Sequence, residues 1–177
     1  MRRRRRADPA APSVTNKAGL MSLEKRAVYG ELADQLAALI AGEPDLVANT
    51  ANLAALIYHG LPELNWAGFY FAREGELVLG PFQGKPACVR IAWGKGVCGS
   101  AAALGQAIVV PDVDQFPGHI ACDAASRSEL VVPLVAGRRV VGVLDLDSPR
   151  AGRFDELDRA GIERLVAILL AHHPDWP

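Results

Sequence analysis

The stretch ELVVPLVAGRRVVGVLDLDS, residues 129–148, decides the fold class. Hydrophobic residues dominate two runs within it, residues 129–135 and 139–146, and each run has the length of a β-strand. The intervening Ala136-Gly137-Arg138 supplies a glycine where the chain has to turn back. This stretch therefore predicts an antiparallel hairpin near the C-terminal end of the chain.

Other strands and helices are predicted on both sides of this hairpin. Residues 64–71 and 76–79 form a second strand pair around the turn Arg73-Glu74-Gly75. Shorter strands are predicted at residues 88–92 and 107–110, with a short helix at 98–104. Helical spacing of apolar residues predicts two N-terminal helices, after Leu23 and after Pro44, and a last helix with Asp155 as its N-cap. Strands in the middle and helices at the ends indicate an α+β fold around a mainly antiparallel sheet.

Size and charge limit the classes of protein to consider. The 177 residues, half of them hydrophobic, suffice for one domain with one core. A net charge of −1 does not favour nucleic acid as a partner. We find no apolar run that approaches the roughly 20 residues of a membrane span. The arginine run at residues 2–6 and the Pro- and Ala-rich segment after it predict a disordered or non-native extension over residues 1–20, followed by a single domain over 21–177.

The cysteines, three in all, lie within residues 85–129, among several glycines. An odd number suits a reducing cytoplasm better than a disulfide scaffold. The spacing C-x9-C-x23-C is not that of a zinc site, and His119 with Cys122 gives one ligand pair at most. Cys98 can be a small core residue or a reactive thiol. Cys122 has polar neighbours, which favour an exposed thiol whose thiolate is stabilised by cations.

Carboxylates and aromatics with the spacing of strands are the other candidates. Asp145 and Asp147 project on the same side of a strand if the strand extends that far. They would then line a pocket and repel each other, but the residues alone favour solvated turn residues, because Asp is depleted in strands. Trp66 and Tyr70 share a face that can line a pocket, and Phe69 points to the opposite, core face.

Six short motifs together resemble one known family. They are NWAGFY (65–70), GPFQGKPAC (80–88), GKGVCG (94–99), FPGHIACD (116–123), SRSE (126–129) and GVLDLDS (142–148). In this order, and with every cysteine in place, they are similar to the free methionine-(R)-sulfoxide reductases, which are GAF-domain enzymes. The resemblance covers residues 21–172 and implies a GAF domain with a six-stranded antiparallel sheet flanked by helices.

The resemblance also implies roles for particular residues. Cys122 becomes the nucleophile, Cys88 the resolving cysteine and Cys98 an auxiliary one. Glu129, which alone would be a surface charge, joins Asp145 and Asp147 in holding the substrate amino group, and Trp66 and Tyr70 become the walls around the methyl sulfoxide. The implied substrate is free L-methionine (R)-S-oxide, the implied reductant is thioredoxin, supplied with electrons from NADPH by thioredoxin reductase, and no metal or bound cofactor is expected. A cytoplasmic homodimer is expected.

Two other functions stay open on the sequence. A GAF domain can bind a small ligand and act as a sensor, and a set of thiols can act as a redox switch without a substrate. The sequence contains no segment large enough for an output domain next to this one, which counts against the sensor.

Overall fold

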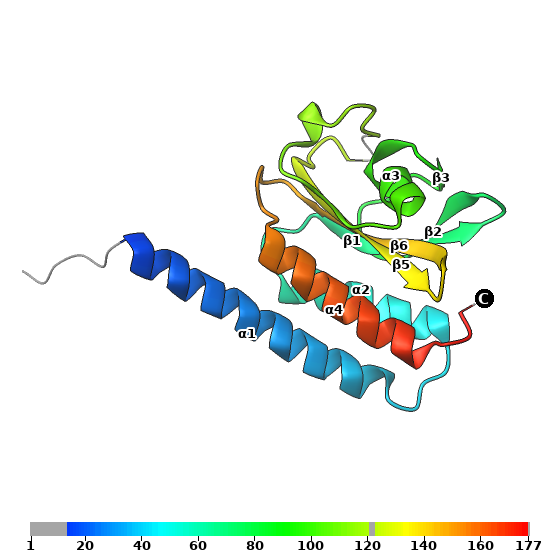
Figure 1. Cartoon of the computed structure of the whole chain (residues 1–177), viewed down its shortest axis with the longest axis horizontal. Coiled ribbons are helices and arrows are strands. Elements are labelled where there is room, and N and C mark those ends of the chain that lie inside the picture. Colours follow the sequence, from blue (N-terminus) through cyan, green and yellow to red (C-terminus); the bar gives the residue numbers. More distant parts are fainter. Residues whose placement is uncertain (1–13, 121–122, 177) are drawn as a thin grey trace, which may run out of the picture.

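The computed structural model describes residues 14–120 and 123–176. In order along the chain it contains α1 (Val14–Ile40), α2 (Leu46–Gly60), β1 (Trp66–Arg73), β2 (Glu76–Gly84), β3 (Arg90–Ala92), α3 (Gly96–Leu104), β4 (Ile108–Val110), the 3-10 turn η1 (Val113–Gln115), β5 (Ser128–Ala136), β6 (Arg139–Ser148) and α4 (Glu156–His172) (Figure 1). The strands form a six-stranded sheet in the order β3-β2-β1-β6-β5-β4, with antiparallel neighbours throughout. The predicted α+β architecture is confirmed.

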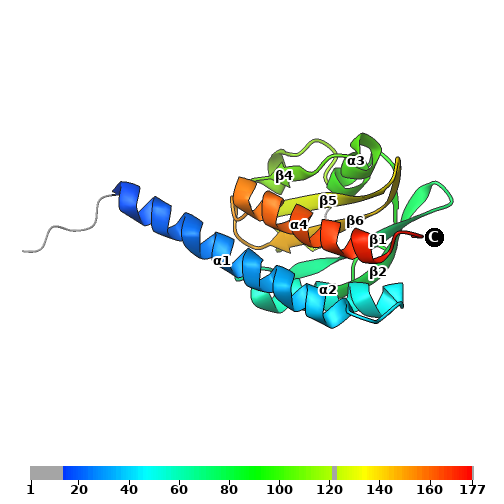
Figure 2. The ribbon, with the colours of Figure 1, turned by 60° about the horizontal axis from the view of Figure 1, so that its bottom comes forward.

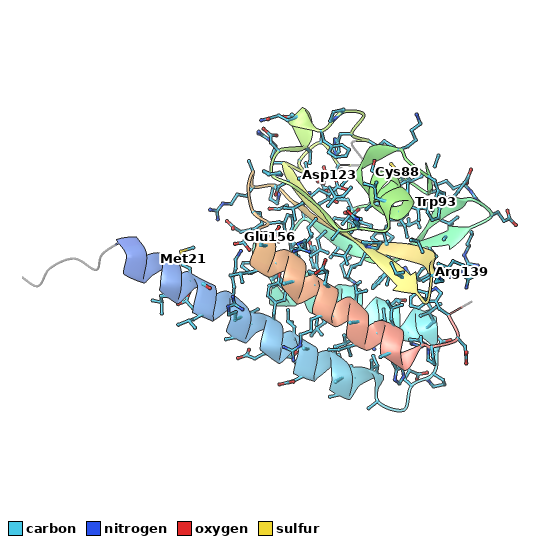
Figure 3. The ribbon with its side chains drawn as sticks, viewed as in Figure 1. Met21, Cys88, Trp93, Asp123, Arg139 and Glu156 are labelled. Carbon is cyan, nitrogen blue, oxygen red and sulfur yellow. The ribbon has the colours of Figure 1, made fainter. Side chains whose placement is uncertain are left out.

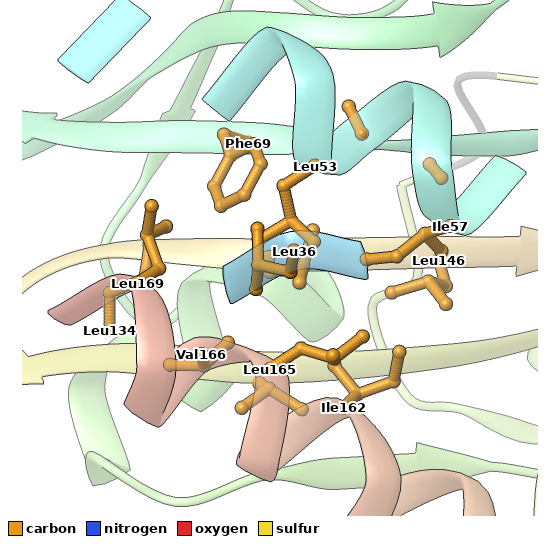
Figure 4. Close-up of a cluster of buried hydrophobic side chains, with 14 of the residues drawn as sticks. Leu36, Leu53, Ile57, Phe69, Leu134, Leu146, Ile162, Leu165, Val166 and Leu169 are labelled. Carbon is orange, nitrogen blue, oxygen red and sulfur yellow. The ribbon is translucent and has the colours of Figure 1, made fainter. Parts of the chain in front are cut away.

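Helices cover the two faces of the sheet unequally. α1, α2 and α4 lie on one face, and α3 lies on the other (Figures 1 and 2). The larger core fills the first interface, where side chains from these helices meet those of the sheet, among them Leu36, Leu53, Ile57, Phe69, Leu146 and Leu165 (Figure 4). Among the described residues, no helix is long and apolar enough to cross a bilayer.

A second, smaller core lies on the α3 face and positions the candidate site. It contains Trp66 and Tyr70 from β1, Cys98 from α3, and Val131 and Val143 from the central hairpin. Phe69 belongs to the larger core on the opposite face. The predicted alternation along the first strand is therefore confirmed: Trp66 and Tyr70 point to one side and Phe69 to the other.

Two boundaries differ by more than two residues from those predicted. α1 begins at Val14, so the expected boundary between residues 20 and 21 falls inside a helix, while residues 1–13 lie outside the described part of the chain. β2 continues to Gly84, although Gly80 and Pro81 suggested an end at Leu79. The register shifts between Gly68 and Tyr70, and beyond this irregularity β2 continues to pair with β1, with Phe82 opposite Gly68 and Gly84 opposite Trp66. Pairing with a neighbouring strand outweighs the local breakers here.

Asp155 is the N-cap of α4, as predicted, and it forms a capping box with Asp158. Asp158 is fully buried, and its carboxylate also accepts hydrogen bonds from Lys25 Nζ (2.6 Å) and Tyr29 Oη (2.9 Å) of α1 and from Arg153 (3.1 Å). This one carboxylate therefore ties α1 to the start of α4.

We expect Asp158→Ala to lower the free energy of unfolding by about 3–5 kcal/mol, because it leaves the buried guanidinium of Arg153 without its partner. Urea unfolding followed by circular dichroism measures the change. The control is Glu163→Ala, which breaks the exposed helical pair with Arg159 and should have little effect. Equal losses in the two variants would contradict the structural role of Asp158.

Candidate active site

A pocket with about 540 Å³ of empty space, including its open mouth, lies between α3 and the sheet. Its walls come from β1, β5, β6, the first turn of α3, residues 85–87, and the described residues His119, Ile120, Asp123 and Ser126. It is lined by six of the predicted site residues: Trp66, Tyr70, Cys98, Glu129, Asp145 and Asp147.

The strand register brings the acids together. Glu129 of β5 is directly opposite Asp147 of β6, and Asp147 is opposite Trp66 of β1 on its other side. Asp145 lies one row further along the same face of β6. The interpretation of both aspartates as solvated turn residues is wrong: β6 continues to Ser148 because β1 and β5 pair with it on both sides, which a solvated turn could not do.

Burial dominates the electrostatics of these acids. Glu129 is 5% exposed and Asp145 is 6% exposed. Burial raises the pKa of both carboxyl groups well above their usual range, and the charge of Asp147 raises them further. Burial also raises the pKa of Asp147 to about 6, against the opposing effects of the Ser126 hydroxyl and His119. One carboxylate oxygen of Asp145, Oδ1, is buried without a hydrogen-bond partner. The pocket is therefore built to receive a cation or to keep protons.

The raised pKa of Asp147 predicts a pH dependence of stability. The folded state keeps a proton on this group that the unfolded chain releases near pH 4, so stability is lost as pH rises from about 4 through 6. We expect the free energy of unfolding of the wild type, relative to Asp147→Asn, to fall by roughly 2–3 kcal/mol between pH 4 and pH 8. Denaturant unfolding across this range measures it. Asp34→Asn, at an exposed acid of α1, is the control: the difference in free energy of unfolding between the wild type and this variant should not change with pH.

The aromatic wall of the pocket, formed by Trp66 and Tyr70, is fixed by ring stacking and by hydrogen bonds. The rings of Trp66 and Tyr70 stack with centroids 5.9 Å apart, and Trp66 also stacks on Phe82 at 5.4 Å. A Cβ at Gly68 would come within 2.6 Å of the Trp66 ring, so the indole can lie across the strand only above a glycine. Trp66 Nε1 donates to the carbonyl of Lys85 and Tyr70 Oη donates to the carbonyl of Cys88. The wall thus also holds the segment that carries Cys88.

The cysteines differ in their surroundings. Cys98 is a buried thiol in the first turn of α3, and its Sγ lies 3.9 Å from Glu129 Oε1. Burial raises the pKa of this thiol well above its usual value, and the charges of Asp145 and Glu129 raise it further. Cys88 is disulfide-bonded and lies on the α3 side of the sheet (Figure 3). Cys122 lies outside the described residues, so its exposure and its distance from the acids stay predictions.

Several pocket residues were missed as site residues by the sequence reasoning. Asp123 accepts hydrogen bonds from Lys85 Nζ and from Asn65 Nδ2, and Asn65 also donates to Ser126 Oγ. Together they connect the segment before Cys88 to the segment after Cys122. Asp123 and Ser126 had been noted only as polar neighbours of Cys122, and nothing in the sequence pattern singled out Asn65 or Lys85.

A further group of donors lies at the base of the pocket. Among the described residues, one group of at least three could hold a metal ion: Cys98, Glu129 and Asp145, whose ligand atoms all lie within 4.8 Å of one another. His119 Nε2 is 3.4 Å from the other carboxylate oxygen of Glu129.

Comparison with known proteins shows the family. Residues 47–169 match the GAF domain family. The chain is 59% identical over 148 residues to Protein YtsP of Bacillus subtilis, a match that covers 82% of this chain and 91% of that protein. It is 52% identical over 147 residues to the free methionine-R-sulfoxide reductase of Escherichia coli, covering 83% and 89% of the two chains.

A solved structure agrees with these sequence matches. The free methionine-R-sulfoxide reductase of Neisseria meningitidis in complex with its substrate superimposes with a TM-score of 0.81 at 47% identity, covering 84% of this chain and 89% of that one. The chain therefore belongs to the GAF-domain family and, within it, to the free methionine-R-sulfoxide reductases.

Proposed function

We propose that this chain reduces free L-methionine (R)-S-oxide to L-methionine, with Cys122 as the nucleophile. The observation that carries the proposal is the pocket itself, in which three acids with raised pKa values face two stacked aromatic rings. The relatives named for this activity support it.

The substrate amino group binds to the carboxylates of Glu129, Asp145 and Asp147. An ammonium group offsets the cost of ionising these buried acids, whereas the neutral amide nitrogen of a peptide does not. This difference favours the free amino acid over methionine sulfoxide within a chain. The methyl sulfoxide end packs against Trp66 and Tyr70.

The substrate carboxylate needs hydrogen-bond donors, and the start of α3 can supply them. Within the glycine-rich turn, the N–H groups of Gly94 and Lys95 already donate to Gly99 and Ala92. The N–H groups of the first helical residues have no acceptor within the helix, and Gly96 and Val97 line the pocket. We assign the substrate carboxylate to these two N–H groups.

Reduction then proceeds through the sulfur of Cys122. Its thiolate attacks the sulfoxide sulfur while a protonated pocket acid donates to the oxygen, since oxygen leaves poorly without a proton. Collapse of the adduct releases methionine and leaves a sulfenic acid on Cys122. The raised pKa values allow one of the three acids to stay protonated near neutral pH while its neighbours hold the ammonium group.

A second thiol completes the cycle. The Cys88 thiol condenses with the sulfenic acid, which gives a Cys88–Cys122 disulfide and water. Exchange with the dithiol of thioredoxin restores both thiols. Support for Cys88 in this role is that it is disulfide-bonded in the structure, whereas Cys98 is a buried thiol and fits the auxiliary role.

The test is NADPH oxidation with thioredoxin, thioredoxin reductase and the separated epimers of free methionine sulfoxide. We expect turnover with the R epimer and little with the S epimer. No turnover, together with tight binding of another small ligand, would instead support the sensor. A Cys88–Cys122 disulfide that forms with peroxide but not with methionine sulfoxide would support the redox switch.

A further inference from the structure

At the base of the pocket, two of the acids that bind the substrate in the proposed reaction lie beside a buried thiol that the attack on the sulfoxide does not use. Cys98, Glu129 and Asp145 are all buried, and their ligand atoms lie within 4.8 Å of one another. Asp145 Oδ1 is buried there without a hydrogen-bond partner. A buried carboxylate oxygen without a partner is costly, so this atom marks a place where a bound cation would be stabilised.

The chemistry of the donors selects a class of metal. A thiol sulfur beside two carboxylates matches the S and O ligands of Zn²⁺, and the imidazole of His119 next to Glu129 is a supporting contact of the kind that zinc ligands have. Mg²⁺ and Ca²⁺ prefer oxygen ligands alone. Tetrahedral zinc with bonds of about 2.0–2.3 Å holds its ligand atoms roughly 3.3–3.8 Å apart, so the three donors would need to close by about 1 Å.

We propose that this pocket binds one Zn²⁺ through Cys98, Glu129 and Asp145, with His119 supporting Glu129 from outside this donor group, and that the metal and the substrate ammonium exclude each other. On binding, the Cys98 thiol releases its proton to solvent and the thiolate sulfur bonds to the metal. The inference that zinc binds depends on the donor atoms alone, whereas the inference that zinc competes with the substrate rests on the proposed function.

The reactive cysteines have to be removed before the site is tested, because free thiols also bind zinc. A Cys88→Ser/Cys122→Ser protein keeps Cys98 as the one thiol of the sequence. Calorimetric titration with Zn²⁺ should give one site per chain with a dissociation constant in the micromolar range or below. Titration with Co²⁺ should give the absorption of a tetrahedral site with a sulfur-to-metal charge-transfer band. Mg²⁺ should not bind.

Variants in this background assign the ligands. Adding Cys98→Ala should weaken zinc binding by at least about 100-fold and remove the charge-transfer band, since it deletes a ligand rather than a supporting contact. His119→Gln, nearer the mouth of the pocket, should weaken it by about 10-fold. Asp34→Asn, at a distant exposed acid, is the matched control and should leave binding unchanged. Denaturant unfolding of each variant checks that it is folded.

Competition tests the second half of the proposal without any turnover. Free methionine should raise the apparent dissociation constant for zinc, and N-acetylmethionine should not, because it has no ammonium group. Absence of zinc binding, or binding that survives Cys98→Ala, would overturn the site. Zinc binding that requires Cys98 but is unchanged by free methionine would contradict the proposed mutual exclusion of the metal and the substrate ammonium. Cys98-dependent binding in a protein whose wild type reduces no sulfoxide would support the metal site and contradict the proposed function.

Discussion

Replacing Cys122 by serine should lower kcat/KM for free methionine (R)-sulfoxide by at least about 10³-fold, because a serine hydroxyl at neutral pH is neither ionised nor a good nucleophile toward sulfur. The NADPH-coupled assay measures multiple turnover. Direct detection of methionine after mixing the reduced enzyme with substrate measures the first turnover. Both should be lost, since no other thiol in the sequence combines the predicted exposure with polar neighbours.

Two matched variants make this result specific to position 122. Cys88→Ser should release about one methionine per chain and then stop, with a sulfenic acid that a dimedone-type probe traps on Cys122. Cys98→Ser should keep the first turnover, because Cys98 is a buried thiol whose raised pKa keeps it protonated. Full activity in Cys122→Ser would remove this residue as the nucleophile, and loss of the first turnover in Cys98→Ser would transfer that role to Cys98.

The central hairpin could be predicted from the sequence because its signals are local. Two hydrophobic runs and the Ala136-Gly137-Arg138 turn define it without reference to the rest of the chain. The end of β6 could not be predicted in the same way. Whether Asp147 lies in a strand depends on Asn65, whose N–H bonds to the Asp147 carbonyl, and on Glu129 opposite it. Local propensity for a turn was outweighed by partners that are distant in sequence.

The residues of the pocket, too, could be predicted from the sequence only in part. Periodicity placed Trp66 and Tyr70 on one face, and the resemblance supplied the acids. No local pattern indicated that Lys85 and Asn65 would meet at Asp123. The contact of Lys25 and Tyr29 with Asp158, across about 130 residues, had no local signal either. Contacts of this kind come from how the layers pack, which a single sequence does not reveal.

Glu129→Gln should lower kcat/KM for free methionine (R)-sulfoxide by about 30- to 5,000-fold. The substitution keeps the shape of a side chain that is 5% exposed and removes its charge. Removing one partner of a buried, hydrogen-bonded charge pair costs about 2–5 kcal/mol, which is the source of that range. The measurement compares kcat/KM for free and N-acetylated substrate in wild type and variant. The wild type should strongly prefer the free amino acid, and the variant should lose most of that preference.

The free energy of unfolding distinguishes a role of Glu129 in substrate binding from a role in supporting the fold. The acids at 129, 145 and 147 repel one another in the empty pocket, and burial penalises their charged forms. Because burial raises the pKa of Glu129, folding at neutral pH requires this carboxyl group either to take up a proton or to keep a penalised charge. Glu129→Gln removes that cost, so the free energy of unfolding should rise while activity falls. Glu76→Gln, in the exposed pair with Arg90, is the control and should change neither quantity appreciably. A variant at 129 that loses activity and stability together would mean that Glu129 supports the fold, and recognition of the amino group would then have to rest on Asp145 and Asp147 alone.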